Sequence, residues 1–221
     1  MHMSKQFVVI GLGNTGSLLV KRLSELGHSV LAIDNEPEVV QDITPFASQA
    51  AVADSSRKNM LQRLPLSKAD FVIVCIGSLE DSLLTILNLK EIGVVNIMAK
   101  ANNSAHCAIL EKMGLQSEYI FQPERDMAIE LANKLDKIGR PNILDFMPLI
   151  DGYSVIEWKC PMNFAGKTLM EANLINKYGV QVIAVKDAKT GELNAVPKAQ
   201  YEFKNGDALL LFGPNEALDK M

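Results

Sequence analysis

The chain has 221 residues, a formal net charge of −4 and 48% hydrophobic residues, which is typical of a globular protein with one or two domains. No basic cluster is longer than two residues, so the composition argues against a nucleic-acid partner. Its three cysteines lack metal-ligand spacing. No apolar run reaches the roughly 18 residues of a membrane span, and no signal peptide precedes the first predicted strand. We therefore expect a cytoplasmic chain.

The first part of the chain alternates short apolar runs with helical patterns. The apolar runs are near-continuous in valine and isoleucine, which is typical of parallel strands covered on both faces. The helical patterns between them provide the crossover connections, so we predict an α/β fold with a doubly wound parallel Rossmann-type sheet. The predicted strands are residues 6–11, 29–34, 49–54, 70–77, 96–101 and 118–123.

A glycine-rich loop, G-x-G-x-x-G, lies between the first predicted strand and the first helix. Gly11 allows the sharp turn, Gly13 lets the backbone approach a pyrophosphate, and Gly16 lets the helix pack against the strand. Asp34 ends the second strand, at the spacing where a carboxylate accepts hydrogen bonds from a ribose. The residues around it include no arginine for a 2′-phosphate, which disfavours NADP. The sequence therefore predicts a bound nucleotide.

Other candidate residues follow the later strands, because the carboxyl ends of parallel strands meet at one edge of a sheet. Asp54 and Ser55 follow the third strand, where they would reach an adenine, or they cap the next helix. Lys100 ends the fifth strand, where it contacts a phosphate or is an ordinary surface lysine. The predicted nucleotide-binding residues are Gly11, Gly13, Asn14, Thr15, Gly16, Asp34, Asn35, Asp54, Ser55, Ile76, Gly77 and Lys100.

The histidines and cysteines do not suggest a catalytic set. Hydride transfer needs an acid or base beside the nicotinamide. His28 lies in a turn, and His106 and Cys107 are neighbours on a predicted helix, where side chains point about 100° apart. We therefore predict a binding site without catalytic residues. A small NAD-dependent oxidoreductase and a stand-alone nucleotide sensor are the alternatives.

The alternation stops after residue 123. Apolar residues then recur at four-, four- and three-residue spacing, which predicts an amphipathic helix whose stripe forms an interface or an intramolecular core. Hairpin patterns follow, which predict a small C-terminal α+β lobe. The stripe consists of Met127, Leu131, Leu135 and Ile138.

Several segments together resemble one family. FVVIGLGNTGSLLVKRLSELGHSVLAID, ADFVIVCIG, NIMAKA, FQPERDMA and GDALLLFG resemble the RCK-type (regulator of potassium conductance) cytosolic regulatory subunits of Ktr/Trk bacterial potassium uptake systems. The resemblance covers nearly the whole chain, with a TrkA-N-like first part and a TrkA-C-like second part. It implies a nucleotide-binding lobe at residues 1–123, a helical crossover and dimer interface at 124–148, and a C-terminal lobe at 149–221. It also implies homodimers that assemble into an octameric ring on a membrane-embedded potassium channel subunit, at the inner face of the membrane.

The same resemblance implies ligands. ATP or ADP, and in some members NAD or NADH, bind the N-terminal lobe, and some relatives bind cyclic di-AMP in the C-terminal lobe. Glu124 matches a family glutamate associated with a divalent cation, Mg²⁺ or Ca²⁺; from the sequence alone it is equally a helix N-terminal carboxylate. Many relatives carry Arg-Phe after the second glycine, where this chain has Asn14 and Thr15. The missing arginine predicts weak discrimination of ATP from ADP, or a preference for NAD or AMP.

Overall fold

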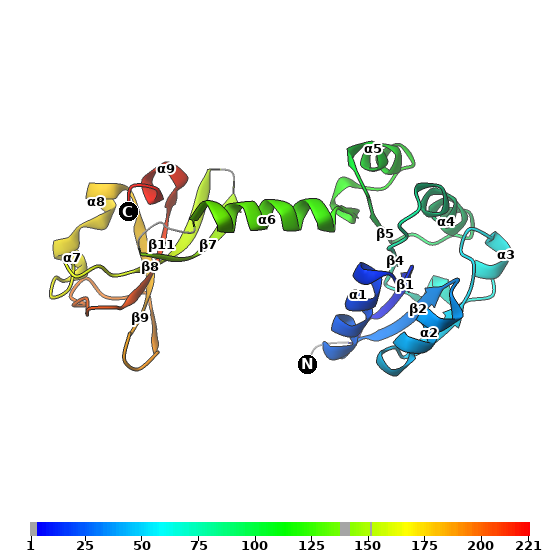
Figure 1. Ribbon diagram of the computed structural model, residues 1–221, viewed down its shortest axis with the longest axis horizontal. Helices are drawn as coiled ribbons and strands as arrows, with labels where there is room; N and C mark the ends of the chain where they lie inside the picture. Colours follow the sequence, from blue (N-terminus) through cyan, green and yellow to red (C-terminus); the bar gives the residue numbers. More distant parts are fainter. Residues whose placement is uncertain (1–3, 138–141, 151) are drawn as a thin grey trace. The chain divides into compact units, whose positions relative to one another are not determined.

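The computed structural model describes residues 4–137, 142–150 and 152–221 (Figure 1). The chain forms two compact units, Met1–Ala128 and Ile129–Met221, and the division falls within helix α6 (Pro123–Lys137). We call them the first unit and the second unit. No helical segment within the described ranges has the length and hydropathy that crossing a membrane requires.

The first unit is built on a six-stranded parallel sheet of order β3-β2-β1-β4-β5-β6. The chain moves outward from β1 in one direction, then returns to β4 and moves outward in the other. This is the predicted doubly wound topology, and it is confirmed. The strands are β1 (Gln6–Ile10), β2 (Ser29–Asp34), β3 (Gln49–Val52), β4 (Phe71–Val74), β5 (Ile97–Lys100) and β6 (Ile120–Phe121).

Helices cover both faces of this sheet, which explains why the strands are apolar throughout. Successive strand residues point to opposite faces, so Val8 joins the core beneath α4 and α5, whereas Val9 joins the core beneath α1 and α2. Both valines are almost fully buried. The helices of this unit are α1 (Asn14–Glu25), α2 (Pro37–Ile43), α3 (Lys58–Leu61), α4 (Leu79–Glu91) and α5 (Ser104–Lys112), with short 3₁₀ helices at Thr44–Phe46, Leu66–Lys68 and Ser117–Tyr119.

The second unit is a five-stranded antiparallel sheet of order β10-β9-β11-β8-β7 with short helices, which confirms the predicted α+β lobe. Its core holds Trp158, Phe203, Leu209 and Leu211, each at most 2% exposed. The elements are β7 (Ile143–Ile150), β8 (Tyr153–Lys159), α7 (Leu169–Ala172), α8 (Leu174–Tyr178), β9 (Gln181–Lys186), β10 (Leu193–Ala195), β11 (Ala208–Pro214) and α9 (Asn215–Leu218).

The segment predicted as a helical crossover, residues 124–148, contains two kinds of structure. It is helical as far as Lys137, and from Ile143 it is strand β7, paired antiparallel with β8. Ile143 and Phe146 pack against the core of the second unit, so the last residues of the segment belong to the sheet of that unit.

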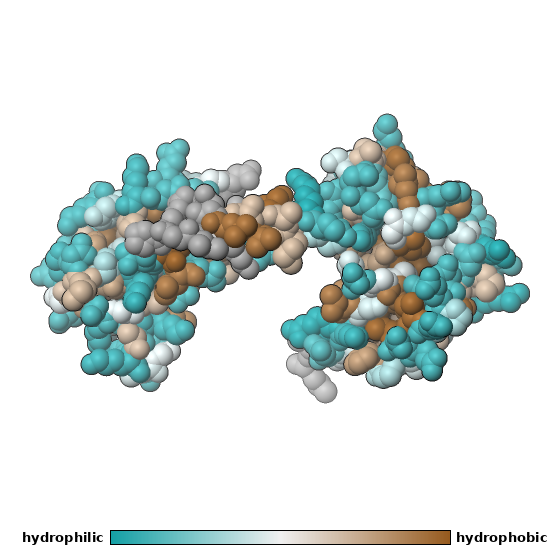
Figure 2. Space-filling view, in the orientation of Figure 1, coloured by the Kyte–Doolittle hydropathy of each residue, from teal (hydrophilic) through white to brown (hydrophobic). Residues whose placement is uncertain are grey.

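Helix α6 carries apolar side chains that are largely exposed. Met127, Leu131 and Leu135 are 62%, 52% and 56% exposed, and apolar residues gather over this helix in Figure 2. Ile138, the last residue of the predicted stripe, lies outside the described residues.

Candidate functional site

The glycine-rich loop joins β1 to α1, where the sequence places it. Gly11 has a φ of +89°, and a Cβ added at Gly16 would lie 1.9 Å from the carbonyl oxygen of Gly11. A Cβ at Gly13 would meet nothing within 4 Å. The fold itself therefore requires glycine at 11 and 16, whereas Gly13 faces open space, which a phosphate group can occupy.

Asp34 holds this loop in place from the end of β2. One carboxylate oxygen, Oδ2, accepts a hydrogen bond from the backbone N–H of Leu12 at 2.6 Å, and Oδ1 accepts one from the N–H of Glu36 at 3.0 Å. Each carboxylate oxygen can accept more than one hydrogen bond, so Asp34 can still bind a ribose.

A cavity of about 410 Å³ lies beside the loop, at the carboxyl ends of the central strands. This edge, at the point where the strand order reverses, is where open α/β sheets bind ligands. Several of the residues predicted from the sequence meet there: Gly11, Gly13, Asp34, Asn35, Asp54, Ser55, Ile76 and Gly77.

The other predicted residues lie outside the lining of this cavity. Asn14 and Thr15 begin α1, and Gly16 packs against the loop itself. Sequence reasoning missed Glu36, Ser56 and Asp81, which also line the cavity. Their positions in the sequence could have indicated them, because each lies within four residues of a predicted site residue.

The cavity lining is acidic. Its charged residues are Asp34, Glu36, Asp54 and Asp81, and no lysine, arginine or histidine belongs to the described lining. The Ser56 hydroxyl donates to Asp54 Oδ1 at 2.5 Å, and this bond, with the Arg57 guanidinium, lowers the pKa of Asp54. An ionised carboxylate at this position accepts hydrogen bonds and repels phosphate.

Arg57 and Lys100 are both engaged in ion pairs. Arg57 Nε lies 2.9 Å from Asp54 Oδ2, and Lys100 Nζ lies 2.5 Å from Glu124 Oε1. The hydrogen bond from Lys100 lowers the pKa of Glu124. No cluster of three or more potential metal-ligating side chains occurs in the described part of the chain, so the roles of Lys100 with phosphate and Glu124 with a cation stay predictions.

His106 and Cys107 have separate partners. His106 is buried, its Nδ1 accepts from the N–H of Asn102 at 3.3 Å, and burial lowers its pKa. Cys107 Sγ accepts from Gln122 Nε2 at 2.6 Å. The two side chains do not form a dyad, as their spacing on a helix predicts.

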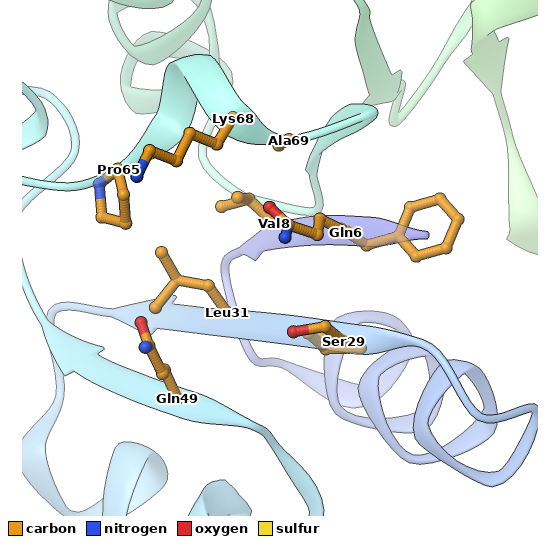
Figure 3. A pocket seen from close by; sticks show the side chains of 10 residues that line it. Gln6, Val8, Ser29, Leu31, Gln49, Pro65, Lys68 and Ala69 are labelled. Atoms are coloured by element: carbon orange, nitrogen blue, oxygen red, sulfur yellow. The ribbon is translucent and has the colours of Figure 1, made fainter. Parts of the chain in front are cut away.

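A second cavity, of about 230 Å³, lies at the opposite edge of the sheet (Figure 3). Gln6, Ser29 and Gln49 are the first residues of three neighbouring strands, and their side chains surround it. None of the residues predicted to bind nucleotide lines this cavity. The candidate nucleotide site is therefore the cavity at the carboxyl edge.

The doubly wound sheet, the glycine-rich loop and the carboxylate at the end of β2 define a Rossmann-type fold, followed in this chain by a C-terminal α+β lobe. Two family models match the chain: TrkA-N domain over residues 7–123 and TrkA-C domain over residues 161–221.

Two relatives illustrate the match. The chain is 38% identical over 212 residues to Ktr system potassium uptake protein C of Bacillus subtilis (strain 168), covering 96% of this chain and 93% of that protein. It is 36% identical over 216 residues to Ktr system potassium uptake protein A of Vibrio alginolyticus, covering 97% and 94%. The chain therefore belongs to the family of Ktr system potassium uptake proteins, and the resemblance noted from the sequence motifs is confirmed.

Solved structures agree on the fold. The GsuK channel bound to NAD matches with a TM-score of 0.58 and 16% identity, over 98% of this chain and 38% of that one. The GsuK RCK domain matches with a TM-score of 0.59 and 17% identity, over 98% and 46%. The chain thus has an RCK-type fold.

Proposed function

We propose that this chain is a nucleotide-binding regulatory subunit of a potassium uptake system. A nucleotide at the carboxyl edge of the parallel sheet changes the shape of an assembly of these chains, and a membrane-embedded potassium channel subunit responds at the inner face of the membrane. The observation that carries the proposal is the open cavity over Gly13 in a chain of the Ktr family. A ligand acts in such a device only through its different affinity for the two states.

The cavity chemistry supports binding without catalysis. Its one thiol, Cys75, lies against the glycine loop, and burial raises the pKa of that thiol to about 12, so it stays protonated and unreactive. Two carboxylates of the lining accept hydrogen bonds from neighbouring groups, Asp34 from the backbone N–H of Leu12 and Asp54 from the hydroxyl of Ser56. Such groups position a ligand.

Assembly is proposed on the same basis. The exposed apolar residues of α6 support a role of residues 124–148 as crossover and dimer interface, because a stripe of this kind favours burial against a partner. The homodimers would assemble further into an octameric ring. Glu124 lies in the first turn of this helix and is proposed to join a divalent cation, Mg²⁺ or Ca²⁺, that accompanies the nucleotide.

A second ligand is proposed for the second unit. A cavity of about 370 Å³ there is lined mainly by apolar side chains, among them Leu169, Ile175 and Ile183, with Asn173 as a polar group. Apolar walls with a few amide groups suit the faces and edges of purine bases. Cyclic di-AMP is the ligand proposed for this cavity.

The function is tested by co-reconstituting the purified chain with its membrane subunit in liposomes and measuring potassium flux. We expect flux to change when ATP, ADP, NAD⁺ or NADH is added, and the change to require this chain. Calorimetry with the same nucleotides, with and without Mg²⁺, identifies the ligand. A flux that is the same with and without the chain, at every nucleotide, contradicts the proposal. Oxidation of NADH by the chain would favour the oxidoreductase alternative.

Ligand choice gives a separate expected result. A guanidinium contact to a γ-phosphate contributes about 1.5–3 kcal/mol, and the positions where relatives carry Arg-Phe hold Asn14 and Thr15 here. The acidic lining adds no compensating charge. We expect the dissociation constants of ATP and ADP, measured by calorimetry, to differ by less than about tenfold. Asn14→Arg should shift the preference toward ATP; tenfold or tighter binding of ATP by the unmodified chain contradicts this expectation.

A further inference from the structure

The loop after β3, residues 53–57, is hydrogen-bonded to the neighbouring helix α4. Asp54 and Ser55 line the nucleotide cavity, and Ser55 is 7% exposed. The loop leads into α3, which lies beside α4 in Figure 1. Helix α4 therefore lies close enough to contact the loop.

Asn88 of α4 makes the most informative of these contacts. Its side-chain nitrogen Nδ2 donates to the carbonyl oxygen of Ser56 at 2.8 Å and to that of Ser55 at 3.3 Å. Asn88 is 9% exposed, and a buried carboxamide is costly unless it is hydrogen-bonded. Asparagine is also a poorer helix former than the leucines around it. The contribution of Asn88 at this position is therefore its pair of hydrogen bonds to the loop.

Thr85, one turn earlier, makes a second contact with the same loop. Its hydroxyl lies 2.8 Å from the hydroxyl of Ser55, and Thr85 is fully buried. One turn later, Glu91 pairs with Lys58 of α3 at 2.7 Å. Residues three apart share one face of a helix, so a single face of α4 contacts the loop through Thr85 and Asn88 and helix α3 through Glu91.

We propose that Thr85 and Asn88 are positioning residues that fix the loop so that Asp54 can read the base of the nucleotide. The proposal rests on the proposed nucleotide-binding function. The side chains of α4 bond to Ser55 and to the carbonyl oxygens of the loop, while Asp54 lines the cavity. An ionised Asp54 accepts a hydrogen bond from the 6-amino group of adenine and repels the 6-oxygen of hypoxanthine. Base selectivity is then set by two residues of α4 that do not themselves line the cavity.

The test compares ADP with inosine diphosphate, whose base carries a 6-oxygen and an N1–H where adenine carries a 6-amino group and an unprotonated N1. We expect the full-length protein to bind ADP more tightly in calorimetry. In Asn88→Leu, and in Thr85→Val, the ratio of the two affinities should fall by about three- to tenfold, the effect of one misplaced hydrogen bond. A general loss of stability would weaken both ligands and leave this ratio unchanged.

Two matched controls lie on the same helix. Thr85→Ser keeps the hydroxyl. Ser82→Ala changes a fully buried serine of α4 whose hydroxyl has no hydrogen-bond partner among the described residues. Both should keep the ratio of the unmodified protein.

The possible outcomes distinguish the positioning role of Thr85 and Asn88 from nucleotide binding itself. A folded Asn88→Leu or Thr85→Val that keeps the full ADP preference overturns the positioning role. Equal binding of both nucleotides by the unmodified protein overturns base reading by the loop and leaves the nucleotide-binding function intact. Binding of neither overturns both. If Asn88→Leu does not fold, Thr85→Val decides, because valine keeps the shape of threonine and removes only its hydroxyl.

Discussion

Gly16→Ala is expected to lower the free energy of unfolding of the first unit by about 3 kcal/mol and to abolish nucleotide binding. The added methyl would lie 1.9 Å from the carbonyl oxygen of Gly11, a backbone atom that cannot move aside without displacing the loop. Helix α1 and the loop must then separate, which deforms the site that presents backbone N–H groups to phosphate. Urea unfolding followed by circular dichroism, together with calorimetry with ADP, measures both effects.

Gly13→Ala is the matched control for this prediction. Nothing lies within 4 Å of a Cβ at this position, so stability should change by less than about 1 kcal/mol. The methyl nevertheless enters the space assigned to the phosphates, and affinity for ADP should fall by about tenfold. Unchanged affinity in Gly13→Ala would mean that the ligand does not pass over this glycine. Unchanged stability in Gly16→Ala would contradict the packing argument.

Asp207→Ala is expected to destabilise the second unit by about 3–4 kcal/mol, because several buried hydrogen bonds to one charged group are lost at once. Asp207 is fully buried. Its Oδ2 accepts from the Tyr201 hydroxyl at 2.8 Å and from the N–H of Lys204 at 3.0 Å, and its Oδ1 accepts from the N–H of Ala188 at 3.1 Å. The carboxylate of Asp207 thus links the turn at Ala188 to the turn at Lys204.

The chain provides its own reporter for this experiment. Its single tryptophan, Trp158, lies in the core of the second unit, so its fluorescence follows that unit during urea unfolding. Tyr201→Phe removes one of the three bonds and should cost about 1 kcal/mol. A loss in Asp207→Ala no larger than the loss in Tyr201→Phe would contradict the prediction.

The first unit could be predicted from the sequence because its signals are local. Valine-rich runs such as the one around Val8 and Val9 report a sheet covered on both faces, and the glycine spacing fixes the loop next to the cavity. The carboxyl edge then brings Asp34, Asp54 and Gly77 together by topology alone.

Contacts between distant segments could not be predicted in this way. In the sequence, Asn88 is a polar residue within a helix, and only the folded chain brings it to the carbonyls of Ser55 and Ser56. The pairing of Lys100 with Glu124 likewise depends on how β5 and the start of α6 meet.

Strand β7 could not be predicted from the sequence for a different reason. It contains Pro148, the last residue of the predicted crossover segment 124–148. In the structure β7 is an edge strand, and an edge position tolerates a residue that cannot donate a backbone hydrogen bond. Proline therefore does not prevent pairing here, although it would in the middle of a sheet.

Each of the two units has its own hydrophobic core, and the division between them falls within one helix. Substitutions in separate cores affect stability almost additively, because they share no packing partners. In evolutionary terms the chain is a pair of modules that can diverge at different rates. One unit can be replaced or retuned while the other keeps its fold.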